Sequence, residues 1–157
     1  MPRFTELLDT RIPPPIVGAV IAAAMWWASS RGLQFDVPAV ARHGLTAGLA
    51  IAGVAFDVLG LMAFRASRTT VNPLSPQRAS ALVTAGVYRV TRNPMYVGMA
   101  LLLLAWAVHL SSGWALLGPV AFVLYITRFQ IRPEEQVLRR LFGAQFDAYA
   151  KRVRRWL

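Results

Sequence analysis

The chain has 157 residues, of which 56% are hydrophobic and 15% charged, and its formal net charge is +10. So few charges cannot coat a soluble domain of this size, so the composition predicts an all-α integral membrane protein with one domain, residues 1–157. The 17 basic residues flank apolar segments rather than gather on one folded face, which excludes a nucleic-acid partner and favours membrane lipids with anionic headgroups.

The first expected membrane span covers about residues 13–30 and contains no charged residue. Its first residues, Pro13 to Pro15, suit the first turn of a helix, where the donor that proline lacks would be unpaired anyway. Residues 1–11 are expected at the membrane interface. A cleaved signal peptide is the alternative, since a basic start precedes the apolar core. The three prolines are unusual for a signal, so an uncleaved span is favoured.

The second expected span covers about residues 44–64. Asp57 is the only acid within any expected span. An intramembrane carboxylate is costly and by default faces a bundle interior or a hydrated cavity, so Asp57 is a candidate to orient a substrate amine or Arg65. A purely structural role is equally open. Small residues along this span allow close helix packing in lipid. These are Gly44, Gly48, Ala52, Gly53 and Gly60.

Residues 65–92 form a connection with five arginines and no acid. Thr69 to Pro73 should be extended and irregular, because a residue that precedes proline avoids the helical region. Leu82 to Tyr88 is expected to be a re-entrant or interfacial segment that turns at Gly86.

Two further spans, about residues 95–110 and 114–131, are joined by a tight Ser-Ser-Gly turn. No charged residue occurs between Arg92 and Arg128, so this pair should be a membrane hairpin whose polar ends meet on one side. Basic residues concentrate in the 65–92 connection and after residue 128. The positive-inside rule therefore predicts a multi-pass protein with four spans and both termini in the cytoplasm, in the inner membrane if the chain is bacterial.

Apolar residues recur at three- and four-residue steps from about residue 133 to 154, which predicts an amphipathic helix along the cytoplasmic face. Glu134 and Glu135 lie in its first turn. The helix dipole favours acids there, so by themselves they need no chemical role. The hairpin, however, brings them beside Arg89 and Arg92. We therefore expect a site for a small charged cofactor.

Common nucleotide-binding and catalytic motifs are missing from the sequence: no Gly-x-Gly-x-x-Gly, Walker loop, His-Glu-x-x-His or Ser/His/Asp set occurs. With no cysteine and only two isolated histidines, no metal site is expected. A zwitterionic cofactor with a ribose remains compatible, because carboxylates can accept hydrogen bonds from ribose hydroxyls or an ammonium while arginines bind a carboxylate.

Four motifs in order resemble the isoprenylcysteine carboxyl methyltransferase family and its phospholipid N-methyltransferase relatives, over Thr69 to the C-terminus. The motifs are Leu82-Val83-Thr84-x-Gly86-x-Tyr88, Arg92-Asn93-Pro94-Met95-Tyr96-x-Gly98, Glu134-Glu135-x-x-Leu138 and Phe142-Gly143-x-x-Phe146-x-x-Tyr149. The resemblance implies a multi-spanning membrane methyltransferase that uses S-adenosylmethionine outside a Rossmann fold. In-line displacement of the methyl group would depend mainly on positioning and exclusion of water.

The resemblance also implies residue roles. Arg128 or Arg132 would orient the acceptor. A carboxylate acceptor needs no general base, whereas for an amine Asp57 or Glu135 would take up the proton. For Tyr88 and Tyr96 the alternative role is an aromatic belt at the membrane interface, and for Gly98 it is helix packing. The cofactor-binding residues would be Leu82, Val83, Tyr88, Arg92, Asn93, Pro94, Met95, Tyr96, Gly98, Glu134 and Glu135.

The chain also departs from this family. Isoprenylcysteine enzymes commonly have His where this chain has Asn93, and the eukaryotic ones have more spans, so the acceptor is expected only to be lipid-like or prenylated, with a carboxylate or an amine. Two alternatives remain open. One is an NADPH-dependent membrane reductase of the sterol-reductase type, and the other is a small non-enzymatic membrane protein that dimerises through Gly44 and Gly48.

Overall fold

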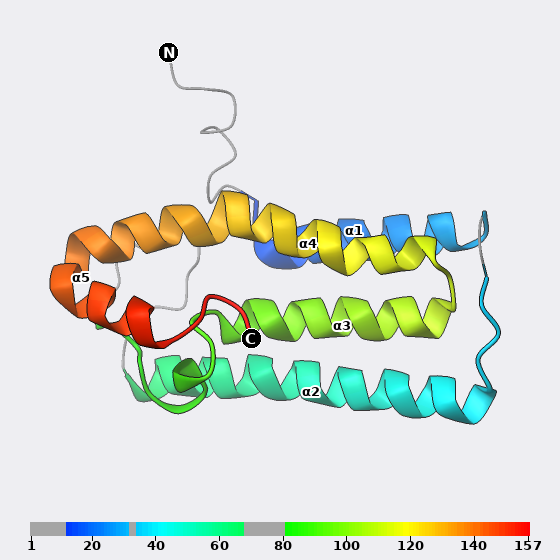
Figure 1. Ribbon diagram of the computed structural model, residues 1–157, viewed down its shortest axis with the longest axis horizontal. Coiled ribbons are helices and arrows are strands. Elements are labelled where there is room, and N and C mark those ends of the chain that lie inside the picture. Colours follow the sequence, from blue (N-terminus) through cyan, green and yellow to red (C-terminus); the bar gives the residue numbers. More distant parts are fainter. Residues whose placement is uncertain (1–11, 32–33, 68–80) are drawn as a thin grey trace, which may run out of the picture.

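The computed structural model describes residues 12–31, 34–67 and 81–157. Every regular element in these ranges is helical, which confirms the all-α expectation. Expectations for residues 1–11 and for Thr69 to Pro73 lie outside the described residues. In chain order the helices are α1 (Pro14–Ser29), α2 (Ala39–Ala66), the 3₁₀ helix η3 (Gly86–Arg89), α3 (Pro94–Leu110), the 3₁₀ helix η4 (Trp114–Leu116), α4 (Leu117–Ile126), the π-helix η5 (Thr127–Ile131) and α5 (Arg132–Arg152) (Figure 1).

Helix α3 is the central element of the fold. Helix α2 packs along one side of it, and α1 and α4 pack against the other (Figure 1). The apolar core of the described residues lies on the side of α3 that faces α1 and α4, and α2 contributes none of its buried members. Its buried members are Val17, Met25, Tyr96, Leu103, Ala107, Ala115, Phe122, Ile126 and Ile131.

Glycines bring α2 and α3 close together. A Cβ at Gly53 would lie 2.9 Å from the carbonyl oxygen of Gly98, and one at Gly60 would lie 2.9 Å from Met95 Cγ. The predicted packing role of these two α2 glycines is therefore confirmed. Gly44 has open space around its Cα. Helix α2 also begins at Ala39, before the expected residue 44. Pro38 precedes its first turn, and a helix can carry charged residues in its first turns.

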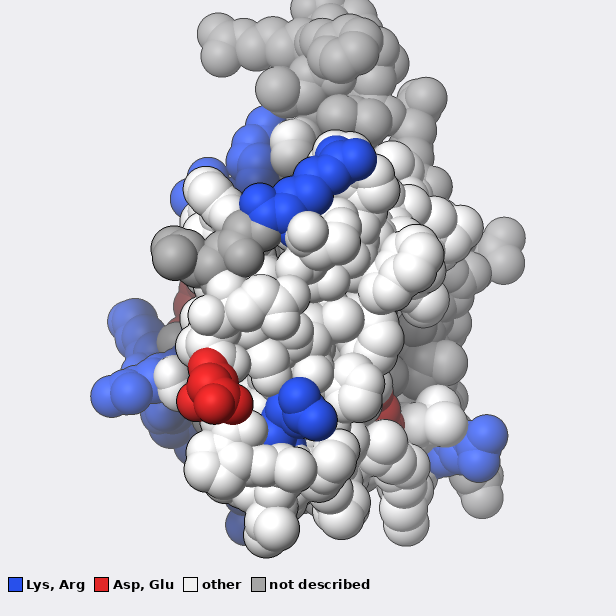
Figure 2. Space-filling model, turned by 90° about the vertical axis from the view of Figure 1, so that its right-hand side faces the viewer, with Lys and Arg blue, Asp and Glu red and all other residues white. Residues whose placement is uncertain are grey.

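Two helical stretches are long and apolar enough to cross a membrane, namely Ala39–Ala66 with 28 residues and Trp114–Arg152 with 39. Helices α1 and α3 are apolar but have 16 and 17 residues. The prediction of four crossings with cytoplasmic termini therefore remains a prediction. Figure 2 shows the end of the bundle that carries the α3–α4 turn, where uncharged surface predominates and charged side chains are scattered.

The C-terminal helix differs from the sequence expectation. It continues from α4 through η5 without interruption, and it is not one straight amphipathic helix over residues 133–154. At Gly143 the backbone takes φ 46° and ψ −123°, and the chain folds back on itself (Figure 1). An ion pair of 2.8 Å between Arg139 and Asp147 joins the two halves. The expectation of a single helix was therefore wrong, because only glycine adopts this conformation readily.

Two predicted turns are confirmed. Gly86 has φ +60° and opens the 3₁₀ helix η3. Ser111, the residue after α3, has φ 48°, and the chain returns into η4 within three residues. The α3–α4 connection is therefore as tight as the sequence indicated, and the start of α3 lies near the end of the helix that follows α4 (Figure 1).

Candidate functional site

The folded-back end of α5 lies against the segment that leads into α3. The Tyr149 hydroxyl donates a hydrogen bond of 2.7 Å to the Tyr88 carbonyl. The backbone N–H of Arg92 donates to the Arg154 carbonyl at 2.9 Å, and Thr91 forms a parallel bridge with Arg154. Motifs separated in sequence by more than forty residues therefore meet at one end of the bundle.

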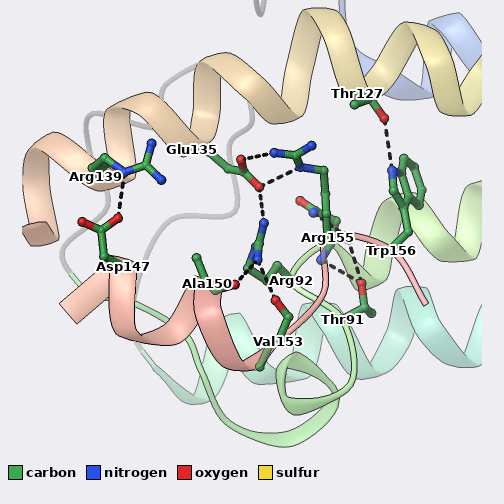
Figure 3. Close-up of polar contacts among 11 residues, drawn as sticks. Thr91, Arg92, Thr127, Glu135, Arg139, Asp147, Ala150, Val153, Arg155 and Trp156 are labelled. Atoms are coloured by element: carbon green, nitrogen blue, oxygen red, sulfur yellow. Dashed lines mark hydrogen bonds and ion pairs between the residues drawn. The ribbon is translucent and has the colours of Figure 1, made fainter. Parts of the chain in front are cut away.

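Glu135 is held by two arginines (Figure 3). Its Oε1 accepts hydrogen bonds from Arg92 Nη2 at 2.8 Å and Arg155 Nε at 3.0 Å, and its Oε2 accepts one from Arg155 Nη2 at 2.6 Å. Arg92 Nη1 donates in addition to the carbonyls of Ala150 and Val153 at 2.8 and 2.6 Å. Both oxygens of Glu135 are thus occupied within the chain, and Arg92 ties α3's entry segment to the end of α5.

Glu134 has a different environment from its neighbour. Its Oε1 accepts a hydrogen bond of 2.6 Å from the hydroxyl of Tyr96, which is buried in the first turn of α3. Its other carboxylate oxygen has no hydrogen-bond partner among the described residues. Among the described residues, Glu134 is therefore held by a single hydrogen bond, whereas Glu135 is held by two arginines.

The electrostatics of the two glutamates diverge accordingly. Burial raises the pKa of Glu134 to about 7; the Tyr96 hydrogen bond opposes this shift and the charge of Glu135 adds to it. Burial would also raise the pKa of Glu135, but the hydrogen bonds and charges of Arg155 and Arg92 together lower it. Burial, and after it the charges of Tyr149 and Glu134, raise the pKa of Tyr88. Glu134 thus titrates near neutral pH, whereas Glu135 stays ionised.

The remaining motif residues surround this junction. Val83 and Tyr88 are buried, and the Tyr88 ring meets the Phe64 ring edge-on with centroids 5.5 Å apart. Leu82 is partly buried. The amide of Asn93 donates to the Arg155 carbonyl at 2.8 Å.

Three motif residues face helix α2. Pro94 begins α3, and Met95 packs with it against Gly60. Gly98 faces Asp57 so closely that a Cβ at residue 98 would overlap the carboxylate. Gly98 therefore packs closely against α2, as the helix-packing alternative expects, and cofactor binding by Gly98 stays a prediction.

The residues expected to act on the acceptor are spread over a wider area. Asp57 lies against Gly98, and its Oδ1 is shielded from solvent without a hydrogen-bond partner among the described residues. Arg128 lies over the Phe129 ring, with Cζ 5.1 Å from the centroid. Arg132 is exposed. The structure therefore brings Asp57 to α3, but it does not gather these three side chains into one cluster.

An apolar groove of about 440 Å³ lies between α3 and α4. One end is formed by Val97, which follows Tyr96, and by Trp156, which follows Arg155. The Trp156 indole N–H donates to Thr127 Oγ1 at 3.1 Å (Figure 3). The groove thus adjoins the polar junction and offers an apolar surface beside it. Its lining residues are Val97, Ala100, Leu101, Leu104, Pro119, Val120, Val123, Leu124, Trp156 and Leu157.

Sequence reasoning missed Thr91, Gln130 and Arg155. Arg155 lies close to three other basic residues, Lys151, Arg152 and Arg154, and nothing in the sequence distinguishes the one that reaches Glu135. Gln130 could have been noticed as a polar residue in an apolar run. Its amide donates to the Ile12 carbonyl at 2.7 Å, and its side chain is fully buried.

Comparison with known proteins identifies relatives of this chain. Residues 41–145 match the model of a family described as phospholipid methyltransferase. The chain is 44% identical over 63 residues to an uncharacterized protein of Haemophilus influenzae, which covers 40% of this chain and 100% of that protein. No solved structure matches the chain.

Relatives from plants carry a functional name. A probable protein-S-isoprenylcysteine O-methyltransferase of Oryza sativa subsp. indica is 39% identical over 75 residues, or 46% of this chain and 38% of the relative. Protein-S-isoprenylcysteine O-methyltransferase B of Arabidopsis thaliana is 28% identical over 131 residues, or 82% of this chain and 58% of the relative. The chain therefore spans roughly half the length of these named relatives or less.

Proposed function

Because this chain belongs to the phospholipid methyltransferase family, we propose that it transfers a methyl group from S-adenosylmethionine to a lipid-like or prenylated acceptor in the membrane. The observation that supports this most directly is the hydrogen bond between Tyr96 and Glu134. It joins two motifs that lie on different helices, at a point where one carboxylate oxygen has no partner within the described chain.

The residues at the junction suit the proposed cofactor. Glu134 can accept a hydrogen bond from its ribose or ammonium, and Tyr88 and Val83 offer buried apolar surface to its adenosine. Leu82, Asn93, Pro94 and Met95 complete the proposed binding segment. When bound, S-adenosylmethionine supplies a methyl group on a sulfonium, which is displaced in line as the neutral thioether leaves.

Arg92 and Glu135 act in this proposal as the framework of the cofactor site. Their charged groups are already hydrogen-bonded to each other, to Arg155 and to backbone carbonyls, so they hold α5 against the entry of α3. This arrangement fixes the position of Glu134, the preceding residue of the helix. Catalysis that depends on positioning the reactants requires a rigid binding site.

The proposed acceptor enters from the membrane. The groove between α3 and α4 can hold a hydrocarbon chain and brings its polar end towards the junction. Arg128 and Arg132 are the candidates to orient a negatively charged headgroup. A carboxylate acceptor then needs no base. An amine acceptor must first lose a proton, and Asp57 suits that role better than Glu135, whose oxygens are occupied by arginines.

We further propose that α1 to α4 all cross the membrane and that the α5 end faces the cytoplasm. Helices of 16 and 17 residues are short for a crossing, so α1 and α3 would lie nearly parallel to the membrane normal. Large apolar side chains exposed on α2 support lipid contact, among them Val40, Ile51 and Met62.

Purified protein can test this function directly. Labelled methyl groups should pass from S-adenosylmethionine into a lipid extract, and the labelled lipid would identify the acceptor. The Glu134→Ala variant should bind S-adenosylhomocysteine at least about tenfold more weakly than the wild type, because it loses a charge-assisted contact. A wild type that neither binds S-adenosylhomocysteine nor transfers the label would overturn the proposal.

A further inference from the structure

Gln130 has a buried amide oxygen that no described residue hydrogen-bonds. Its side chain is 0% exposed, and its Nε2 donates a hydrogen bond of 2.7 Å to the carbonyl of Ile12. Because that partner is an acceptor, the nitrogen must face it, and Oε1 is then the opposite end of the amide. This oxygen has no hydrogen-bond partner within the part of the chain that the structure describes.

Such an oxygen is unusual and needs an explanation. Most buried polar side-chain atoms have at least one partner, since leaving one unsatisfied costs free energy. Gln130 also lies in the π-helix η5, Thr127–Ile131, where the N–H of Arg132 reaches the carbonyl of Thr127 five residues before it. Single π-helical turns occur frequently at functional sites. Both observations indicate that this turn serves a ligand rather than packing alone.

The position of Gln130 relates it to the junction. Residues 130 and 134 are four apart in one continuous helical stretch and therefore lie on the same face, one turn from each other. Helical side chains lean towards the N-terminus, so the carboxylate of Glu134 leans towards the turn that carries Gln130. Tyr96, which holds Glu134, belongs to the same core cluster as Ile131. A ligand on Glu134 has Gln130 as a neighbour.

We propose that Gln130 is a further binding residue of the methyl-transfer site, and that its Oε1 accepts a hydrogen bond from an ammonium group of the ligand. This inference rests on the proposed function. A carboxylate and an amide oxygen on one helix face supply two acceptors, which suits a cation with several N–H donors. The ammonium has two possible sources, the amino-acid end of the cofactor and an amine headgroup of the acceptor.

The Gln130→Met variant tests this proposal, since Met has a similar length and can form neither hydrogen bond. The matched control is Gln136→Met, because Gln136 is exposed on the same helix. Calorimetric titration compares S-adenosylhomocysteine, which has the ammonium, with methylthioadenosine, which lacks the whole amino-acid part. If the cofactor supplies the ammonium, Gln130→Met should bind S-adenosylhomocysteine about tenfold more weakly and methylthioadenosine unchanged.

The acceptor arm measures initial rates at saturating S-adenosylmethionine. If an amine headgroup supplies the ammonium, Gln130→Met should raise KM for the amine lipid about tenfold and leave the binding of S-adenosylhomocysteine unchanged. Unchanged constants in both arms, with only a lower melting temperature, would overturn the inference, because Gln130 would then merely anchor Ile12. Equal weakening of methylthioadenosine and S-adenosylhomocysteine would overturn it too.

A second variant covers the case in which Gln130→Met does not fold. Gln130→Glu keeps the length and, as the protonated acid that burial favours, both a donor to the Ile12 carbonyl and an acceptor oxygen. A bound ammonium should then be held about as tightly as in the wild type, and about tenfold weaker binding would contradict the proposal. These outcomes are separate from the proposed function itself, which fails only if the wild type neither binds S-adenosylhomocysteine nor transfers methyl groups.

Discussion

Glu134 and Glu135 are neighbours in the chain, yet they meet different surroundings. Consecutive residues on a helix point about 100° apart, so one side chain reaches Tyr96 on α3 while the other reaches Arg92 and Arg155. The sequence showed two acids in a first helical turn and could not distinguish them. Their partners come from distant segments, so only the tertiary structure distinguishes a carboxylate that accepts from one tyrosine from a carboxylate that two arginines hold.

The pKa of Glu134 predicts a pH dependence of cofactor binding. A ligand with an ammonium binds the ionised carboxylate better, and burial raises the pKa of that carboxyl to about 7. Between pH 8 and pH 6, affinity for S-adenosylhomocysteine should therefore fall about tenfold. Titration calorimetry at several pH values measures this. Glu134→Gln should bind weakly with a flat profile, and an equally flat wild-type profile would exclude Glu134 as the ligand.

The same shift has a consequence for stability, with a defined sign. Because the folded-state pKa of Glu134 lies above the ordinary value of 4.5, the folded state holds this proton more firmly than the unfolded state. The resulting contribution is complete below about pH 4.5 and is lost as the pH rises through about 7. Glu134→Gln should remove this part of the pH dependence of the melting temperature.

Arg155 offers a test of the framework. The Arg155→Ala variant leaves Glu135 with Arg92 alone, and the free energy of unfolding should fall by about 1–3 kcal/mol. Glu135 is only 13% exposed at its side chain, so solvent compensates poorly. Arg139→Ala is the matched control, because its ion pair with Asp147 is 55% and 48% exposed and should contribute less than about 1 kcal/mol. Equal losses in detergent-solubilised protein would count against the framework role.

At the scale of elements, the helices were largely predictable and the fold-back was not. Charge-free runs that begin at prolines mark α1 and α3, because apolar length and helix starts depend on local sequence. The apolar period after residue 133 runs across Gly143 without interruption, so the pattern favoured one long helix. Gly143 was the only local signal of a bend, and a glycine alone does not predict its direction.

The fold-back of α5 depends on the backbone of Gly143. At φ 46° and ψ −123° an L side chain is strained, so Gly143→Ala should cost about 1–3 kcal/mol of unfolding free energy. It should also weaken binding of S-adenosylhomocysteine, because Arg155 and Tyr149 lie beyond the bend. Thermal unfolding and calorimetry measure the two effects. A variant with wild-type stability would show that the bend does not need glycine.

The contact between α2 and α3 depends on Gly98. A methyl group there would overlap the carboxylate of Asp57, so Gly98→Ala should lower the unfolding free energy by about 1–3 kcal/mol. Gly44→Ala is the control, since nothing lies within 4 Å of a Cβ at that position of α2. The control should be neutral or stabilising by up to about 1 kcal/mol. Similar melting temperatures for both variants would contradict the close packing.

At the scale of the whole molecule, charge is distributed unevenly along the bundle. The α5 end carries most of the described arginines, whereas the opposite end shows scattered charges (Figure 2). The sequence predicted this asymmetry, because the basic residues in each connection can be counted without knowledge of the tertiary structure. It could not predict which charges pair, since pairing depends on the bend at Gly143 and on the approach of the two chain segments.

Cysteine labelling can test the proposed orientation, and the absence of native cysteines makes it simple. Asp36→Cys lies in the α1–α2 connection and Lys151→Cys on α5, and both positions are exposed. In sealed vesicles with the external side outward, a membrane-impermeant maleimide should label residue 36 and spare residue 151 until detergent is added. Labelling of both before lysis, or the reverse pattern, would contradict the topology.

The pairing of Asn93 with the Arg155 carbonyl also has a temporal consequence. These two residues are 62 positions apart in sequence. At about 5–20 residues per second, a ribosome needs roughly 3–12 s to synthesise the second after the first. In the proposed topology, helix α3 would therefore enter the bilayer before its polar cap exists. If the proposed function holds, the cofactor site is completed last, and a nascent chain stalled before Arg155 should be unable to retain S-adenosylmethionine.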